Sequence, residues 1–442
     1  MVRSSRVWVL VLVALAASAE ARKAPRPVIE DDDEVVDAGA PPAPAPEADV
    51  EADAAADAAL AAALEIVEAP ALELVIVGPG EDDYTLFGHA AMRVIDDPDH
   101  PETARVFNFG ITDFGNKSLV GDFIGGRVEF WGDVGPYGAT AAGWRRDDRT
   151  ITRYPVLLPD GARRRLVARM ERDVLPANRA YIYDTFRENC GTRLRDYLDT
   201  YSGGGLRAAI GTEPSGRSFR DDARHAYSNR TALLMVTELF AGVDTDQPRS
   251  PWELTYRPEY LAEQLAQVQL ADGPLLGAPS VEHARQAPDP RDGMPNHGQV
   301  LWLALAALLG LLGWWLPGRG PRVRGGVLVA VVLLTTLIGT TMLWLGLTTD
   351  WAELQRNPAI FVFIPLDLGL LWTAGRLFWT GQAGSAGVAR AWLQGRLVVG
   401  LLLAALTPVI GALHGPLPPR LLGLALAFVA LRSLGERAGE AG

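Results

Sequence analysis

The chain of 442 residues contains a single cysteine, Cys190. A lone cysteine has no internal disulfide partner, so Cys190 is either an inert buried thiol or a reactive group. A reactive thiol needs a base, and among the six histidines His89 stands apart. It opens an expected strand directly after Phe87-Gly88, whereas the others lie in turns, a polar helical stretch, a connector or a membrane edge. A Cys190/His89 pair would perform acyl transfer, with the imidazole removing the thiol proton.

The expected surroundings of Cys190 suit a nucleophile. A helix is expected over residues 190–201, and its first turn would offer Cys190 free N–H groups and the positive end of the helix dipole, both of which favour a thiolate. The backbone N–H groups of Cys190 and Gly191 would also form an oxyanion hole, in which one donor lowers the barrier by about 3–4 kcal/mol. The pattern alone supports equally well a small buried cysteine and a structural histidine.

The elements around this pair predict an α+β domain over residues 71–272. Strands are expected at residues 72–77, 89–96, 105–110 and 149–158, which are rich in β-branched and aromatic residues. Helices are expected at residues 160–174, 190–201, 233–240 and 258–268, where apolar residues recur with helical spacing.

The first 70 residues predict export. Arg3 and Arg6, an apolar run, and the small-x-small site Ala19-Glu20-Ala21 are typical of a signal peptide over residues 1–21, with an uncleaved anchor as the alternative. Residues 22–70 are rich in Ala, Pro, Asp and Glu and predict a disordered linker. Thirteen acidic residues within 27–70 account for the net charge of −12 and leave the rest at about +1. Because no cluster of Lys and Arg stands out, no nucleic-acid partner is expected.

Residues 298–434 predict a bundle of about five transmembrane helices. The candidate spans are 298–316, 325–347, 358–375, 397–414 and 420–434, and most approach the ~20 apolar residues that a bilayer requires. A Pro-rich connector over residues 273–297 would precede the bundle, and residues 435–442 would form a cytoplasmic tail. Loops after the first, third and fifth spans, together with the adjoining span ends, hold eight arginines against two on the opposite side, which predicts that the N-terminal domain lies outside the cytoplasm.

Three segments resemble motifs of the Lnb family of bacterial lipoprotein N-acyltransferases. Residues 86–94, LFGHAAMRV, resemble its FGHxxxRV motif, and residues 106–114, VFNFGITDF, resemble YNYGxxDF. Residues 181–196, YIYDTFRENCGTRLRD, are similar to its YxYDxFxxNCxTRxRD segment. The resemblance spans about residues 72–270, in the same order, and implies a permuted papain-like (NlpC-like) fold in which a histidine strand precedes a cysteine helix.

The resemblance implies a ping-pong acyltransferase of the bacterial inner membrane, multi-pass, with its N-terminal domain in the periplasm. Cys190, with His89 as base, would take an acyl chain from a phospholipid as a thioester. The α-amine of a diacylglyceryl-cysteine apolipoprotein would then accept the chain. No cofactor is implied, and the sequence lacks metal-ligand spacing. A membrane-anchored cysteine peptidase or amidase acting on cell-wall peptide is the alternative, as is a non-catalytic envelope binding protein; the apolar spans favour the lipid substrate.

Further candidate residues flank the pair. Asn108 is expected to orient His89, since papain-like sites use a polar third member, although a strand asparagine that satisfies a loop is an equally good interpretation. Asn189 is expected either to cap the cysteine helix or to line the site. Gly191 is an oxyanion candidate, and Tyr183 is expected to line the site or to pack beside it.

Three candidates belong to the membrane region. Asp350 and Asn357 resemble the family's outside loop TDH…N-P, in which this chain has Trp351 where the family usually has His. Asp367 falls inside the third expected span, where a charge costs about 2.5–3.5 kcal/mol or more, so it is either functional or paired within the bundle.

Overall fold

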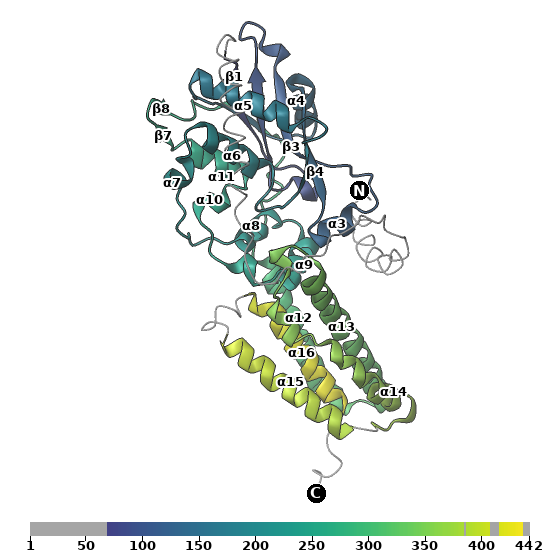
Figure 1. The fold of residues 1–442 in the computed structure, drawn as a ribbon. Helices are drawn as coiled ribbons and strands as arrows, with labels where there is room; N and C mark the ends of the chain where they lie inside the picture. Colours follow the sequence, from purple (N-terminus) through teal and green to yellow (C-terminus); the bar gives the residue numbers. More distant parts are fainter. Residues whose placement is uncertain (1–68, 384–385, 407–414, 436–442) are drawn as a thin grey trace, which may run out of the picture.

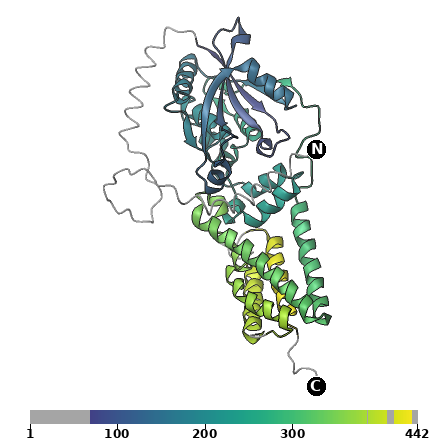
Figure 2. The same cartoon turned by 90° about the vertical axis from the view of Figure 1, so that its right-hand side faces the viewer.

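The computed structural model describes residues 69–383, 386–406 and 415–435. The predicted signal peptide, nearly all of the predicted linker and most of the predicted tail lie outside the described residues. An α+β domain stands on one end of a helical bundle, as Figures 1 and 2 show. This architecture confirms the expected fold class, an α+β domain followed by a helical region with apolar spans.

The domain is built on an antiparallel seven-stranded sheet with the strand order β6-β4-β3-β2-β1-β5-β9. The strands are β1 (Ala71–Val77), β2 (His89–Ile95), β3 (Arg105–Ile111), β4 (Glu129–Pro136), β5 (Ile151–Pro155), β6 (Ala180–Ile182) and β9 (Ser280–His283). In β1, the consecutive residues Leu74 and Val75 point to opposite faces of the sheet, and both are fully buried. Both faces of the sheet are therefore covered.

Different helices cover the two faces of the sheet. On one face, α5 (Asp160–Asp173), α6 (Cys190–Tyr201) and α11 (Pro258–Leu265) share a core with alternate β2 residues such as Met92. On the other face, α4 (Tyr137–Arg146) packs against the intervening β2 residues. The first residue of β2, His89, and the first residue of α6, Cys190, thus come from adjacent layers.

Five short helices complete the described part of the domain, and some of them lie next to the bundle. They are α3 (Leu119–Gly125), α7 (Leu206–Ile210), α8 (Phe219–Ala226), α9 (Thr231–Phe240) and α10 (Pro251–Leu254). Helices α8 and α10 begin at serine N-caps, Ser218 and Ser250, each of which forms a reciprocal capping box. Figure 1 shows α9 and α3 at the lower end of the domain, next to the bundle.

The sheet is larger than the sequence predicts. Strands β4 and β6 were not expected, and β9 lies inside the segment 273–297 that was expected to be a connector. Because β9 pairs with β5 along the sheet edge, the domain continues past residue 272. The strand expected over 149–158 is shorter, residues 151–155, so that Arg149 precedes it.

The bundle consists of α12 (His297–Trp315), α13 (Pro321–Thr348), α14 (Leu371–Thr380), α15 (Ala386–Leu406) and α16 (Leu417–Ser433). Within the described residues, three helices are long and apolar enough to cross a membrane: His297–Gly318, Pro321–Thr348 and Ala386–Leu406. A bent pair, Ala352–Phe361 with Pro365–Thr380, raises the number to four if it counts as one span. The 17-residue α16 packs closely against α12.

The prediction of one continuous helix over residues 358–375 is wrong. Residues 358–370 contain two short 3-10 helices, η7 (Pro358–Phe361) and η8 (Pro365–Leu370), and α14 begins only afterwards. The two prolines explain the break, because proline lacks an N–H donor and clashes with the preceding turn of an α-helix. The start expected for the fourth span is also wrong: α15 begins at Ala386, so Arg396 lies buried within it and not in a cytoplasmic loop.

Candidate functional site

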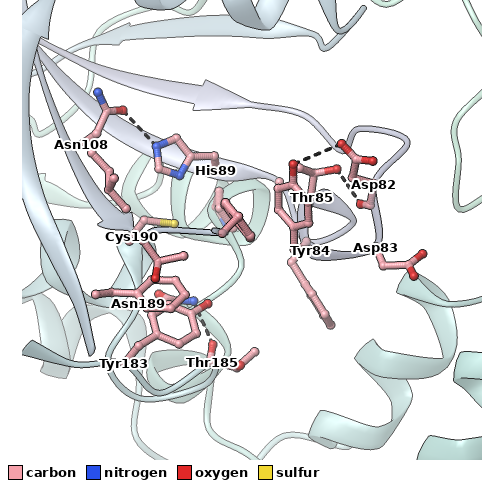
Figure 3. Close-up of a pocket in the computed structure, with 18 of the residues that line it drawn as sticks. Asp82, Asp83, Tyr84, Thr85, His89, Asn108, Tyr183, Thr185, Asn189 and Cys190 are labelled. Carbon is pink, nitrogen blue, oxygen red and sulfur yellow. Dashed lines mark hydrogen bonds between the residues drawn. The ribbon is translucent and has the colours of Figure 1, made fainter. Parts of the chain in front are cut away.

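A cavity of about 1460 Å³ lies between the start of β2 and the start of α6. Five of the predicted site residues line it: His89, Asn108, Tyr183, Asn189 and Cys190. Figure 3 shows them on neighbouring walls, with His89 and Asn108 from the sheet and Cys190, Asn189 and Tyr183 from the start of α6 and the loop before it. Residues far apart in the sequence therefore meet at one place.

The sheet register brings Asn108 to His89. Ala91 of β2 pairs with Asn108 of β3, so Asn108 and His89 share a face of the sheet as diagonal neighbours. The His89 Nε2 atom lies 3.0 Å from the Asn108 Oδ1 atom. Because an amide oxygen can only accept, Nε2 carries the hydrogen and Nδ1 keeps a lone pair. In Figure 3 the second ring nitrogen of His89 lies on the side of Cys190.

The surroundings of His89 favour the uncharged imidazole. Its ring lies 6.0 Å from the Trp144 ring, centroid to centroid. Burial lowers the pKa of His89 to about 4, with a smaller contribution from the nearby Arg149 cation, while the hydrogen bond to Asn108 acts in the opposite direction. At neutral pH the imidazole is therefore a proton acceptor, as a general base must be.

Asn189 positions the helix that carries Cys190. As the N-cap of α6, its Oδ1 atom accepts a hydrogen bond from the Thr192 amide at 3.0 Å, and its own amide donates to the Thr192 hydroxyl at 2.8 Å. Its Nδ2 atom donates to the carbonyl oxygens of Thr185 and Tyr256, each at 2.9 Å. Both side-chain amide hydrogens are thus engaged, so the geometry assigns Asn189 a capping role and leaves no hydrogen for an oxyanion.

The thiol of Cys190 is protonated at neutral pH. Burial raises the pKa of Cys190, and this effect outweighs the backbone N–H groups of Ala90, Gly191 and Cys190 itself and the Arg149 cation, which favour the thiolate. Since Ala90 directly follows His89, strand β2 reaches the sulfur atom. Cys190 and His89 are therefore both uncharged at neutral pH, and a reaction at the sulfur would require the thiol proton to move to a base such as the imidazole.

Gly191 allows the start of α6 to lie against the backbone of residues 255–256. A Cβ atom at this position would lie 2.8 Å from the Tyr256 carbonyl oxygen and 2.9 Å from that of Thr255. Real Cβ atoms do not approach that closely, so no larger residue fits without movement of the backbone. The N–H group of Gly191 faces the thiol.

Tyr183 forms part of the cavity wall. Its ring stacks on that of Phe130, with centroids 4.2 Å apart and planes inclined by 21°. Burial and the neighbouring charge of a Cys190 thiolate both raise the pKa of Tyr183, so its hydroxyl stays protonated. The hydroxyl group is thus available as a hydrogen-bond donor.

The three membrane-side candidates lie outside this cavity. Asp350 pairs with Arg127 at 3.3 Å. The Asn357 Nδ2 atom donates to the Leu239 carbonyl oxygen at 2.9 Å, which ties the loop to α9. Asp367 is buried in the bundle and pairs with Arg396. All three candidates therefore have structural partners.

Trp351 and its neighbours connect the bundle to one rim of the cavity. The Trp351 ring packs against Phe123 of α3, with centroids 5.3 Å apart, and its Nε1 donates to the Phe123 carbonyl oxygen. The hydroxyl of Thr349 donates to the Ile124 carbonyl oxygen at 2.7 Å. Because α3 contributes Leu119, Val120 and Phe123 to the cavity lining, the loop after α13 fixes this rim.

Several lining residues are not among the residues predicted from the sequence: Tyr84, Trp144, Arg149, Tyr227 and Tyr256. They lie in turns or helices whose sequences carry no motif, and only the tertiary fold brings them to the cavity. Within the described residues, no group of three or more His, Cys, Asp or Glu side chains is arranged to hold a metal ion.

A cysteine at a helix start and a histidine on a strand share one cavity of an α+β domain that apolar helices join to a membrane. This combination defines a class of membrane protein that has a cysteine and a histidine in one cavity outside its apolar helices. Residues 59–221 match the family described as the Lnb N-terminal periplasmic domain, which confirms the resemblance of this part of the chain to the Lnb family. The chain is thus a membrane protein with a periplasmic N-terminal domain. No curated protein and no solved structure gives a match.

Proposed function

We propose that this protein is a lipoprotein N-acyltransferase of the bacterial inner membrane, which moves an acyl chain from a phospholipid through a Cys190 thioester to an apolipoprotein amine. One observation carries the proposal: the cavity that holds Cys190 and His89 extends to an apolar rim fixed to the membrane bundle. A lipid ester could reach the thiol by this path without its chains crossing water.

The rim supports a lipid substrate by its composition. Phe114 is 62 % exposed, and Val120 and Phe123 are also exposed, although all three line the cavity. A cluster of exposed apolar side chains beside a membrane region is typical of a surface that meets lipid. A peptide substrate would give no reason for apolar side chains at this rim or for the membrane bundle.

The first half of the proposed reaction forms the thioester. His89 Nδ1 takes the proton of the Cys190 thiol as the sulfur attacks the ester carbonyl carbon of a phospholipid. The tetrahedral intermediate collapses with cleavage of the ester C–O bond. His89 returns the proton to the departing lysophospholipid oxygen, and the acyl chain remains on the Cys190 sulfur. Asn108 keeps the Nε2–H tautomer in place during both proton transfers.

The second half transfers the chain to the acceptor. The α-amine of a diacylglyceryl-cysteine attacks the thioester carbonyl carbon, and His89 Nδ1 accepts a proton from the nitrogen. The C–S bond then breaks, an amide is formed, and the thiolate of Cys190 regains the proton from His89. Backbone N–H groups at the start of α6 would stabilise the oxyanion in both halves.

The test is mass spectrometry of the intact full-length protein after incubation with phospholipid. We expect a mass gain of one fatty acyl group, labile to hydroxylamine, that disappears on addition of an apolipoprotein peptide with a free α-amine. The Cys190→Ala variant should gain no mass, and His89→Ala should gain it far more slowly.

A different result would exclude the proposal. Cleavage of a cell-wall peptide, without any acyl adduct from lipid, would identify a cysteine peptidase or amidase. Full biological function of the Cys190→Ala variant in cells would identify a non-catalytic binding protein.

A further inference from the structure

Arg149 is a buried cation in the wall of the cavity. It follows the αL turn at Asp148 and precedes β5, and only 7 % of its surface is exposed. Its Nε atom donates to the Gly78 carbonyl oxygen at 2.8 Å, which fixes the side chain against the Gly78-Pro79-Gly80 turn. Its Nη2 atom is buried without any hydrogen-bond partner.

The lack of a carboxylate partner sets Arg149 apart from the other buried arginines described in the domain. Arg93 pairs with Glu73 at 2.6 Å, and Arg220 pairs with Asp246 at 2.7 Å. Within the described residues, no carboxylate forms an ion pair with Arg149. A buried guanidinium without a counter-ion is costly, because it loses hydration and gains no opposite charge. Such a group is expected to meet an anion that comes from outside the protein.

The position of Arg149 places that anion beside the thiol. Arg149 lines the same cavity as His89 and Cys190, and its charge influences the pKa of both groups. Burial lowers the pKa of Arg149 itself, yet a guanidinium stays charged at neutral pH. The planar fork of a guanidinium matches two oxygen atoms of a phosphate group.

We propose that Arg149 binds the phosphodiester anion of the lipid donor and thereby places the neighbouring glycerol ester at Cys190. The inference rests on the proposed function and names the part of the donor that the site recognises. Donors with a phosphodiester are preferred over diacylglycerol, whereas the identity of the group beyond the phosphate contributes little through this contact.

The test uses the lone cysteine as a reporter and needs no acyl transfer. Full-length protein in detergent is treated with iodoacetamide, and the alkylation rate of Cys190 is followed by mass spectrometry. Three probes are compared: an ether-linked phosphatidylglycerol, a dialkylglycerol without phosphate, and glycerophosphoglycerol without chains. For the wild type we expect half-protection by the phospholipid at a concentration at least tenfold lower than by either other probe.

Variants then assign the effect to the side chain, each compared with its own rate without lipid. In Arg149→Gln, phospholipid and dialkylglycerol should protect Cys190 equally well. In Arg149→Lys, phospholipid should remain partly better than dialkylglycerol. Arg146→Gln removes an exposed arginine that does not line the cavity and should behave as the wild type.

Three outcomes would overturn the inference. The first is equal protection of the wild type by phospholipid and dialkylglycerol. The second is a preference for phospholipid over dialkylglycerol that is unchanged in Arg149→Gln. The third is protection by glycerophosphoglycerol equal to that by phospholipid, which would make a free phosphodiester the ligand. If Arg149→Gln does not fold, the wild-type comparison still tests for recognition of the phosphodiester, and Arg149→Lys tests the side chain. Ether lipids carry no transferable chain, so protection without any thioester from ester lipids would refute the proposed function and leave the phosphate site standing.

Discussion

Burial acts in opposite directions on the two reacting groups, since it raises the pKa of the Cys190 thiol and lowers that of the His89 imidazole to about 4. Both groups are uncharged at pH 7, in contrast to a preformed thiolate–imidazolium pair. The neutral pair protects the only thiol of the chain from oxidation, since the thiolate is the reactive form. In the proposed reaction, the thiol would lose its proton only when the carbonyl carbon of the substrate is in place.

Alkylation of the free enzyme measures this state. Below the raised pKa of Cys190, the thiolate fraction grows about tenfold for each pH unit, so the iodoacetamide rate should rise with that slope from pH 6 to pH 9. His89→Ala should change this rate little, because the neutral imidazole holds no thiolate. A rate that levels off below pH 7 in the wild type, and not in His89→Ala, would instead reveal a preformed ion pair.

Asn108 tunes the base, and its variants should move the acid limb of the reaction. The hydrogen bond from His89 to Asn108 raises the pKa of His89 towards its ordinary value. Asn108→Ala should therefore shift the acid limb of acyl-enzyme formation to lower pH, with a loss of roughly tenfold or more in rate from the unfixed ring. Asn108→Asp should shift the limb to higher pH, because a carboxylate stabilises the imidazolium. If the acid limb lies at the same pH in the wild type, Asn108→Ala and Asn108→Asp, Asn108 does not influence the pKa of His89.

The sequence indicates the reacting residues much better than their surroundings. Cys190, His89 and Asn108 each lie in a recognisable motif, and the structure brings them to one cavity. Arg149 and Trp144 lie in a segment of mixed charge without any motif. Their contacts depend on how α4 and β5 fold back over β2, which no local pattern in the chain encodes.

At the scale of elements, the start of α6 depends on close contact with the backbone of residues 255–256. Gly191→Ala would place a Cβ atom 2.8 Å from the Tyr256 carbonyl oxygen. We expect a loss of about 1–3 kcal/mol in the free energy of unfolding, as for other overpacked sites, together with slower acylation. Gly143→Ala, in α4, meets no atom within 4 Å and should stabilise by about 0.5–1 kcal/mol. Denaturant titration of both variants checks the pair, and equal stabilities would exclude the contact.

Elements with a strong hydrophobic period were predicted well, and those without one were missed. Helix α6 begins and ends at the expected residues, Cys190 and Tyr201, because its apolar side chains keep one face. Strand β4 reads EFWGDVGP and is mostly exposed or half-buried, so it shows no clear alternation. Strand β9 lies at a sheet edge in a polar segment, where pairing with β5 and not composition decides the structure.

At the scale of the molecule, a buried ion pair holds the broken helical segment before α14 in the bundle. Asp367 in η8 accepts hydrogen bonds from Arg396, from Thr335 at 2.9 Å and from Trp392 at 3.0 Å. Arg396 also donates to the Val362 carbonyl oxygen, which the broken helix leaves without an α-helical partner. The charge that the sequence marked as a functional candidate therefore has a full set of structural partners.

Removal of one member of the Asp367–Arg396 ion pair should destabilise the protein more than removal of both members. Asp367→Leu leaves Arg396 buried without a counter-ion and should destabilise the protein by about 3–5 kcal/mol. The double variant Asp367→Leu/Arg396→Met should recover most of that loss and most of the acyl-transfer activity. Thermal unfolding in detergent and the intact-mass assay give the two readouts. A double variant that is stable and inactive would show that Asp367 takes part in function.

The exposed rim and the membrane bundle make a joint prediction about how substrate arrives. Phe114→Asp/Val120→Asp removes apolar side chains beside the bundle, and because burial of one such side chain contributes about 1.5–3 kcal/mol, acylation from phospholipid vesicles should fall at least about tenfold. Acylation by a water-soluble short-chain thioester should stay within about twofold of the wild type, since this donor does not use the rim. Val281→Asp is the matched control, because Val281 is also 62 % exposed and does not line the cavity. Equal losses of acylation rate with both donors would show that the substitutions damage the catalytic site itself. An unchanged rate with vesicles would show that lipid does not enter by this rim.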